Sequence, residues 1–173
     1  MQMPPAGHSL AELNGCPPAA FVTALGGIFE HSPWVAEAAL GRRPFRDEAH
    51  LLAELCAAMR RAPRERRVAL IRAHPDLAVR LEKLTAASQR EQAGAGLDRL
   101  ADAELAEFQR LNTAYRARFG FPFVICARLN AKDAILAAMR RRLGHDPAAE
   151  EEAALVEIEK IAALRLADIL QSP

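Results

Sequence analysis

The chain has 173 residues, the length of one ordinary globular domain, and can bury an apolar core without disulfides or a structural metal. Hydrophobic residues make up 51% and charged residues 26%, which argues against a disordered polar chain and against a membrane protein. Lysine and arginine number 23 and aspartate and glutamate 22, for a formal net charge of +1. A general nucleic-acid binder carries a positive excess, so we expect no nucleic-acid partner and instead a small or locally recognised one.

Cysteine usage and the N-terminal residues indicate the compartment. Cys16, Cys56 and Cys126 are odd in number, widely spaced and never in a CxxC pair, so neither a disulfide framework nor a structural zinc site is expected. Met1 to Gly7 lack the basic cluster and apolar core of a secretory signal, and no apolar run approaches the ~20 residues of a membrane span. We therefore predict a cytoplasmic protein without membrane association.

The spacing of apolar residues predicts an all-α fold. Leucine and alanine recur at three- and four-residue intervals nearly throughout, and β-branched residues never alternate over a useful length. We expect one compact bundle of about eight to ten helices with one short extended segment. No repeat or interdomain linker interrupts the sequence, so residues 1–173 are predicted to form a single domain, with residues 1–8 loosely held.

The predicted helices of the first half begin at recognisable N-terminal signals. Ser9-Leu10-Ala11-Glu12 has the form of a capping box, and Pro17-Pro18 opens a second helix. Ser32 is predicted to cap a third helix, with Pro33 at its first position, that runs through Leu40. Two further helices are expected, at Asp47 to Arg61 and from Pro63 through Ile71.

The second half contains the extended segment. Phe121 to Cys126 is an apolar run in which Pro122 biases Phe121 away from helix, so a buried extended segment is predicted. The helices expected around it are a short one after His74-Pro75, one between Ser88 and Leu97, one at Asp102 to Arg118 ended by Gly120, one at Lys132 to Leu143, and one from Pro147 to about Leu170 capped by Asp146.

His74 is the first candidate for chemistry. It lies in Ala73-His74-Pro75-Asp76-Leu77, where Pro75 prevents the preceding helix from continuing and prepares the start of the next. At a helix N-terminus the dipole disfavours imidazolium, so a neutral ring is expected near neutral pH. The alternative is a loop histidine that only satisfies a backbone group.

Ser88, Glu91 and Gln92 stand at positions i, i+3 and i+4, so in a helix their side chains share one face. Such a face offers a hydroxyl, a carboxylate and an amide to one small polar ligand. The alternative is that Ser88 to Glu91 is a capping box, whose side chains satisfy only the first-turn amides.

Backbone and arginine groups supply the remaining candidates. If this extended segment is buried, the backbone amides of Phe123 to Ala127 need hydrogen-bond acceptors. Two sources of these acceptors stay open, a bound ligand and a second loop. Arg128 and Arg165 each suit a carboxylate, although most helical arginines are solvated. Arg165 lies between Leu164 and Leu166 and therefore needs a partner or an exit to water.

Motifs for metals, phosphates and covalent nucleophiles are missing from the sequence. It contains no HExxH or similar ligand spacing, no phosphate-binding glycine loop, no GxSxG elbow and no Cys-His signature. We therefore expect no metal and no cofactor, which leaves acid–base chemistry by side chains.

Several of these motifs, taken in order over about residues 10–170, resemble one family: the 2-oxo-4-hydroxy-4-carboxy-5-ureidoimidazoline (OHCU) decarboxylases of urate breakdown. The segments that carry the resemblance are Phe29-Glu30-His31-Ser32-Pro33-Trp34 with Arg43-Pro44-Phe45, His74-Pro75-Asp76-Leu77, Ser88 to Gln92 with Gly96-Leu97, Leu111-Asn112 with Tyr115, Phe119-Gly120-Phe121-Pro122-Phe123-Val124-Ile125-Cys126-Ala127-Arg128, and Glu159-Lys160-Ile161-Ala162 to Arg165-Leu166.

The resemblance implies an all-α homodimeric carboxy-lyase that needs no cofactor and converts this ureidoimidazoline to (S)-allantoin and CO2. It implies that His74 is the proton donor and that Glu91 lies on the binding helix, and from the chemistry we expect Glu91 to share the catalytic work. The residues expected to bind the substrate are Pro75, Ser88, Gln92, Phe123, Val124, Ile125, Cys126, Ala127 and Arg165.

Two other classes of function stay open at this point. A catalytically silent helical interaction module needs the apolar stripes but none of His74, Glu91 and Arg165, all of which are present. A lyase or hydrolase acting on another ureido or purine-derived ring needs similar groups, because sequence does not give the shape of a pocket. Turnover of allantoate or ureidoglycolate would indicate the second class, and no turnover of any such compound would indicate the first.

Overall fold

The structure of the protein is a computed structural model that describes residues 7–170. Over this range the chain forms nine α-helices and three short 3-10 helices, and no β-strand occurs in it. The predicted all-α class is confirmed. The helices are α1 (Leu10–Gly15), α2 (Pro18–Leu25), α3 (Trp34–Ala39), η1 (Leu40–Arg42), α4 (Glu48–Arg61), α5 (Arg64–Ala73), η2 (Leu81–Lys83), α6 (Ala86–Gly94), α7 (Asp102–Phe119), η3 (Ala127–Leu129), α8 (Lys132–Arg142) and α9 (Pro147–Leu170).

The described chain divides into two compact units. The first contains residues up to 70 and from 159 onward, and the second contains residues 71–158. The single domain over residues 1–173 stays a prediction. Of the segment 1–8 expected to be loosely held, residues 1–6 lie outside the described residues, whereas the His8 backbone N–H donates to the Ile169 carbonyl at 2.9 Å.

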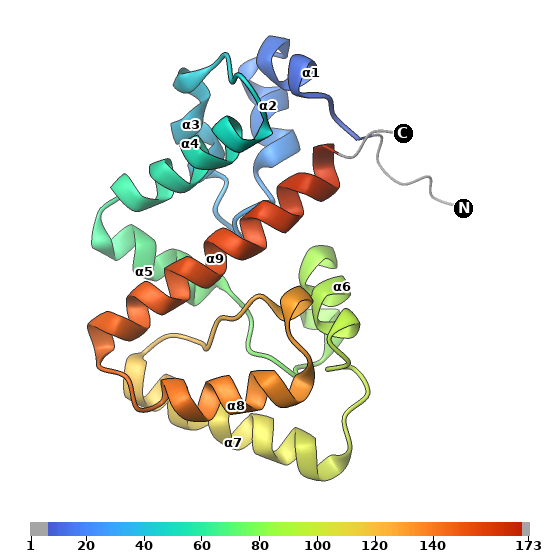
Figure 1. Ribbon diagram of the computed structural model, residues 1–173, viewed down its shortest axis with the longest axis vertical. Coiled ribbons are helices and arrows are strands. Elements are labelled where there is room, and N and C mark those ends of the chain that lie inside the picture. Colours follow the sequence, from blue (N-terminus) through green and yellow to red (C-terminus); the bar gives the residue numbers. More distant parts are fainter. Residues whose placement is uncertain (1–6, 171–173) are drawn as a thin grey trace. The chain divides into compact units, whose positions relative to one another are not determined.

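In the first unit α3 packs against both α2 and α4 (Figure 1). The buried apolar side chains of this unit include Phe21, Leu25, Val35, Leu51 and Leu55. The helix starts follow the local sequence, because Ser9 and Glu12 form the predicted capping box and the Asp47 side chain accepts from the His50 amide. Local capping signals thus place α1 and α4 as the sequence predicted.

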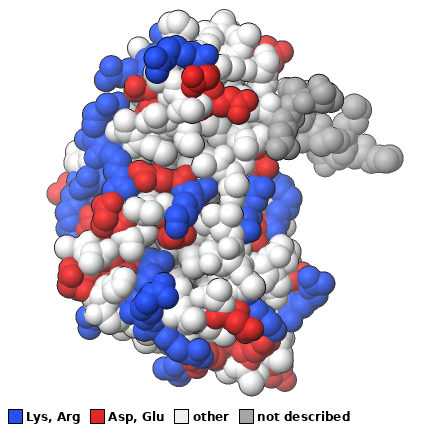
Figure 2. Space-filling view, in the orientation of Figure 1, with Lys and Arg blue, Asp and Glu red and all other residues white. Residues whose placement is uncertain are grey.

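In the second unit α7 and α8 lie side by side (Figure 1), and α6 packs against η3. Their shared core includes Phe108, Tyr115, Ile135 and Met139, which are all fully buried. Gly120 ends α7 in the left-handed conformation at φ 75°, as predicted from its position after the last apolar turn. Figure 2 shows cationic and anionic side chains interspersed on the visible face, which agrees with the near-neutral net charge.

Two local predictions are wrong, and one alternative is excluded. Ser32 does not cap α3, because its hydroxyl donates to the Glu30 carbonyl at 2.9 Å and Pro33 occupies the N-cap position. No helix follows directly after His74-Pro75, where residues 74–80 are irregular, with a bend at residue 74 and a turn at residues 77–78. The helix predicted between Ser88 and Leu97 is present as α6, which starts at Ala86. Thr85 is its N-cap and accepts from the Ser88 amide, so the alternative of a capping box at Ser88 to Glu91 is excluded.

Candidate active site

His74 lies immediately after the C-terminal end of α5, not before a new helix. Its backbone N–H donates to the Ile71 carbonyl at 3.1 Å, which closes the last turn, and its side chain is buried. Pro75 ends the helix, and Ala78 at φ 58° adopts the left-handed conformation that keeps a helix from restarting. The prediction that His74 lies at a helix N-terminus is therefore wrong, because the histidine follows the C-terminal end of α5.

The turns that follow His74 are held by side chains from α6 and α7. The Gln92 side-chain oxygen accepts from the Ala78 amide at 3.0 Å, and its nitrogen donates to the Asp76 carbonyl at 3.1 Å. Asn112 donates to the Leu77 carbonyl at 2.9 Å. Arg116 donates from Nε to both Asp76 carboxylate oxygens, at 2.9 and 3.1 Å. The shape of residues 76–78 is thus fixed by hydrogen bonds from two helices.

The face of α6 predicted from sequence is present. Ser88 and Gln92 are buried, and Glu91 is partly exposed between them. The capping-box alternative fails because Thr85 occupies the N-cap. Since α6 packs against η3, this face lies close to the Phe123–Ala127 segment. Electrostatics agree with this placement, because burial and then the Glu157 and Glu91 carboxylates raise the pKa of the Cys126 thiol.

Residues 121–127 are extended up to η3 and buried, as predicted. The Val124 carbonyl accepts from Arg142 Nη1 at 2.8 Å, and the Cys126 amide donates to Glu157 Oε2 at 2.9 Å. Within residues 7–170, the backbone amides of Ile125 and Ala127 donate no hydrogen bond to another residue. Buried amides without an acceptor are costly, so these two donors suit the oxygen atoms of a bound ligand.

Arg165 belongs to the first unit and has the partner that its apolar surroundings require. Its Nη1 lies 2.8 Å from Glu30 Oε2 and 3.3 Å from the Gly27 carbonyl oxygen, and both charged side chains are buried. This ion pair holds α9 to the α2–α3 connection within that unit. The substrate-binding role expected for Arg165 stays a prediction, and Arg128 is exposed.

Comparison with known proteins places this arrangement in a family. A profile described as OHCU decarboxylase matches residues 14–167. The chain belongs to the OHCU decarboxylase family. It is 47% identical to the 2-oxo-4-hydroxy-4-carboxy-5-ureidoimidazoline decarboxylase of Haloferax volcanii, over 95% of this chain and 97% of that protein. The corresponding Amia calva decarboxylase is 44% identical, over 88% of this chain and 89% of its own length.

A solved structure of an (S)-allantoin synthase is also similar in fold, with a TM-score of 0.78 and 33% identity. The match covers 94% of this chain and 54% of that one. The resemblance stated from sequence motifs and the decarboxylase class that it implied are confirmed by these relatives.

Sequence reasoning missed a buried polar cluster behind the extended segment. Arg142 and Glu150 form a buried ion pair with Nη2 and Oε1 2.6 Å apart, and Tyr115 donates a hydrogen bond to the same carboxylate. Burial, strengthened by that carboxylate, raises the pKa of Tyr115. The signal that could have revealed the cluster is a charged residue at a core-spaced position, such as Arg142 after Ile135 and Met139 on α8.

Two classes of feature are missing from the described part of the chain. No three or more histidine, cysteine, aspartate or glutamate side chains between residues 7 and 170 gather as a metal site requires. Likewise, none of the helices assigned in that range is both long and apolar enough to cross a membrane.

Proposed function

We propose that this chain removes CO2 from 2-oxo-4-hydroxy-4-carboxy-5-ureidoimidazoline and forms (S)-allantoin, using side chains and backbone groups without a cofactor. The observation that carries the proposal is the meeting of three parts of one unit. These are the His74 turns, the Ser88–Gln92 face of α6 and the buried segment that contains the Ile125 and Ala127 amides. The family relatives named for this reaction support it.

The reaction needs charge placement and one directed proton. When the bond to the carboxylate breaks, its electron pair moves into the ring toward the adjacent carbon–nitrogen double bond, and CO2 leaves. The ring nitrogen that receives the electron pair takes one proton from solvent, the ring carbon that bears the ureido group takes another, and the neighbouring hydroxyl loses one to become a carbonyl. Protonation from a single face gives a single enantiomer, so the position of the donor decides the stereochemistry.

His74 and Glu91 are proposed to divide these proton transfers. His74 donates to the ring carbon from its buried position just after the C-terminal end of α5. Glu91, between buried Ser88 and Gln92, is placed to accept the hydroxyl proton. These roles are assigned from the resemblance and from the position of both residues in the second unit.

Substrate binding is proposed to combine backbone donors with a shaped wall. The amides of Ile125 and Ala127 donate to substrate oxygens, and Ser88 adds a hydroxyl. The other residues expected to bind substrate are Pro75, Gln92, Phe123, Val124, Cys126 and Arg165. Gln92 and the Cys126 amide already bond within the protein, so we assign their contribution to the shape of the site.

We also propose a homodimer in the cytoplasm, as the resemblance implies. All three cysteines are free, and Cys126 is buried, which suits a reducing compartment. Analytical ultracentrifugation at several concentrations tests the dimer, and a single monomer peak throughout would reject it.

The function is tested by circular dichroism while urate oxidase and the next ring hydrolase generate the substrate in the cuvette. Spontaneous decay gives racemic allantoin, so a rapid (S)-allantoin signal requires the enzyme. We expect His74→Ala and Glu91→Gln to lose this signal, whereas His8→Ala, a histidine of the first unit, keeps it. A racemic and unaccelerated trace with the unmodified protein rejects the proposal, and preferential turnover of allantoate or ureidoglycolate indicates a different ureido substrate.

A further inference from the structure

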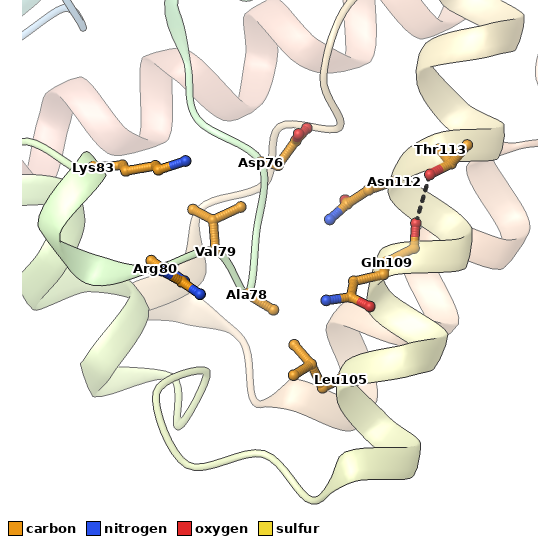
Figure 3. A pocket seen from close by; sticks show the side chains of 9 residues that line it. All are labelled: Asp76, Ala78, Val79, Arg80, Lys83, Leu105, Gln109, Asn112 and Thr113. Carbon is orange, nitrogen blue, oxygen red and sulfur yellow. Dashed lines mark hydrogen bonds between the residues drawn. The ribbon is translucent and has the colours of Figure 1, made fainter.

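A cavity lies behind the turns that follow His74. It has a volume of about 530 Å³ and is lined from one side by Asp76, Ala78 and Val79 and from the other by α7. Figure 3 shows these residues facing Gln109 and Asn112 across the open space. This space is open to solvent, so packing does not fix the turns from this side, and hydrogen bonds hold them there.

Asn112 provides the buried bond that reaches these residues from α7. Its Nδ2 donates to the Leu77 carbonyl at 2.9 Å, across 35 positions of sequence, and Leu77 is only three residues beyond His74. Gln92 from α6 holds the neighbouring Asp76 carbonyl and Ala78 amide. Side chains from two helices therefore hold three consecutive residues by hydrogen bonds, and Asn112 makes the buried bond from α7.

The oxygen of the Asn112 side-chain amide indicates what the bond to Leu77 contributes. Its Oδ1 is buried and has no hydrogen-bond partner among residues 7–170. Burying an unpaired acceptor costs about as much as a paired donor contributes, so this side chain brings folding little net stability. An apolar side chain of similar size, such as leucine, avoids that cost. The effect of an asparagine at position 112 is therefore to fix the position of the Leu77 carbonyl.

We propose that Asn112 is a positioning residue for the decarboxylation: through Leu77 it fixes the turns that set the place of His74. The inference rests on the proposed function, in which His74 donates the proton. Asn112 acts through the backbone and does not contact the substrate, so its loss lowers kcat and leaves KM unchanged. A small displacement of a reacting group is enough, because proton transfer requires hydrogen-bond distance.

The test compares Asn112→Ala and Asn112→Asp with Gln109→Ala, which lines the same cavity from α7. Asparagine and aspartate have the same size, but aspartate has no N–H to donate. We expect kcat per folded molecule to fall about 10- to 100-fold in both Asn112 variants, with KM within about twofold of the unmodified value. A kcat equal to that of Gln109→Ala, or a loss confined to KM, overturns the proposal.

A second variant keeps the test decisive if the Asn112 variants do not fold. Arg116→Gln removes the exposed ion pair with Asp76. Because this site is on the surface, the variant is expected to fold normally. A lower kcat at unchanged KM supports positioning of the turns, and an unchanged kcat contradicts it. Absence of activity in the unmodified enzyme rejects the proposed function itself, whereas normal activity with unaffected variants rejects this inference alone.

Discussion

The two segments that form the candidate site are supported in opposite ways. Residues 121–127 are fully enclosed, with aromatic rings around Tyr115 and the guanidinium of Arg142 4.3 Å from the ring centre of Phe123. Residues 74–80 border a cavity of about 530 Å³ and are shaped by side-chain hydrogen bonds. Substitutions behind the first segment should therefore reduce stability, and those behind the second should reduce turnover at nearly constant stability.

Charge burial explains this difference. Arg142 and Glu150 are 5% and 0% exposed, and the same arginine donates to the Val124 carbonyl. The Arg116–Asp76 pair that holds the other segment is partly exposed to solvent. Water screens an exposed pair, whereas a buried pair that loses one member leaves an uncompensated charge. The same residue types thus serve stability in one segment and geometry in the other.

The largest expected effect comes from Arg142→Met. This change removes the buried arginine from the Glu150 carboxylate and leaves it only His145 and Tyr115, so we expect the free energy of unfolding to fall by about 3–5 kcal/mol. Urea unfolding measures the loss, and Arg141→Met, an exposed arginine of the same helix, is the matched control. Adding Glu150→Leu should restore part of the stability. A loss below about 1 kcal/mol would show that the buried pair does not support this segment.

A smaller effect is expected from Gly120→Ala, at the junction of α7 and the buried segment. Gly120 has φ 75°, and the nearest atom to an added Cβ is Arg72 Nη2 at 3.7 Å, an ordinary contact. The cost therefore comes from the backbone, and we expect a loss of about 1–2 kcal/mol. Gly94→Ala, in α6 with nothing within 4 Å, is the control and should not destabilise the protein. Equal stability of the two variants would contradict this assignment.

The sequence predicts the conformation of residues 121–126 better than that of residues 74–80, because only the first is determined by neighbouring residues. The extended conformation of residues 121–126 follows from Pro122, and the bounds of α7 and α9 follow from apolar spacing and from Gly120 and Asp146. Local signals decide these features.

The turns after His74 have no such local determinant. Their bonds come from Gln92, Asn112 and Arg116, which are 16, 35 and 40 positions away from their partners. A helix restart after Pro75 is therefore a reasonable local prediction that long-range hydrogen bonds override. The Ser88 capping box fails similarly, because Thr85 lies one turn earlier and takes the cap.

Ala78→Gly is the counterpart of Gly120→Ala in the hydrogen-bonded segment. Glycine relieves the left-handed strain at φ 58°, worth about 1–2 kcal/mol, but it adds backbone freedom to the unfolded chain and removes a buried methyl group. These contributions nearly cancel, so we expect the free energy of unfolding to change by less than about 1 kcal/mol. Urea unfolding beside Gly120→Ala measures the difference, and a loss as large as in that variant would show that packing holds both segments.

The smallest effect concerns Glu107, which ties α7, the helix of Asn112, to α8, the helix of Arg142. Hydrogen bonds from Arg110 and then Arg140 lower the pKa of this carboxyl from 4.5 to about 2. The folded protein therefore binds this proton more weakly than the unfolded chain does. The resulting stabilisation is fully present above pH 4.5 and is lost as the pH falls toward about 2.

Comparing the unmodified protein with Glu107→Gln by urea unfolding from pH 6 down to pH 3 tests this assignment. The unmodified protein should be slightly more stable at pH 6, because the site is partly exposed and solvent screens the attraction. The difference should shrink continuously with acidification, and high salt should reduce it at pH 6. Glu65→Gln, an exposed glutamate of α5, is the control for the general effect of removing one carboxylate. If the difference does not depend on pH, the bridge between α7 and α8 is not electrostatic, and the two supporting helices are joined by their apolar contacts alone.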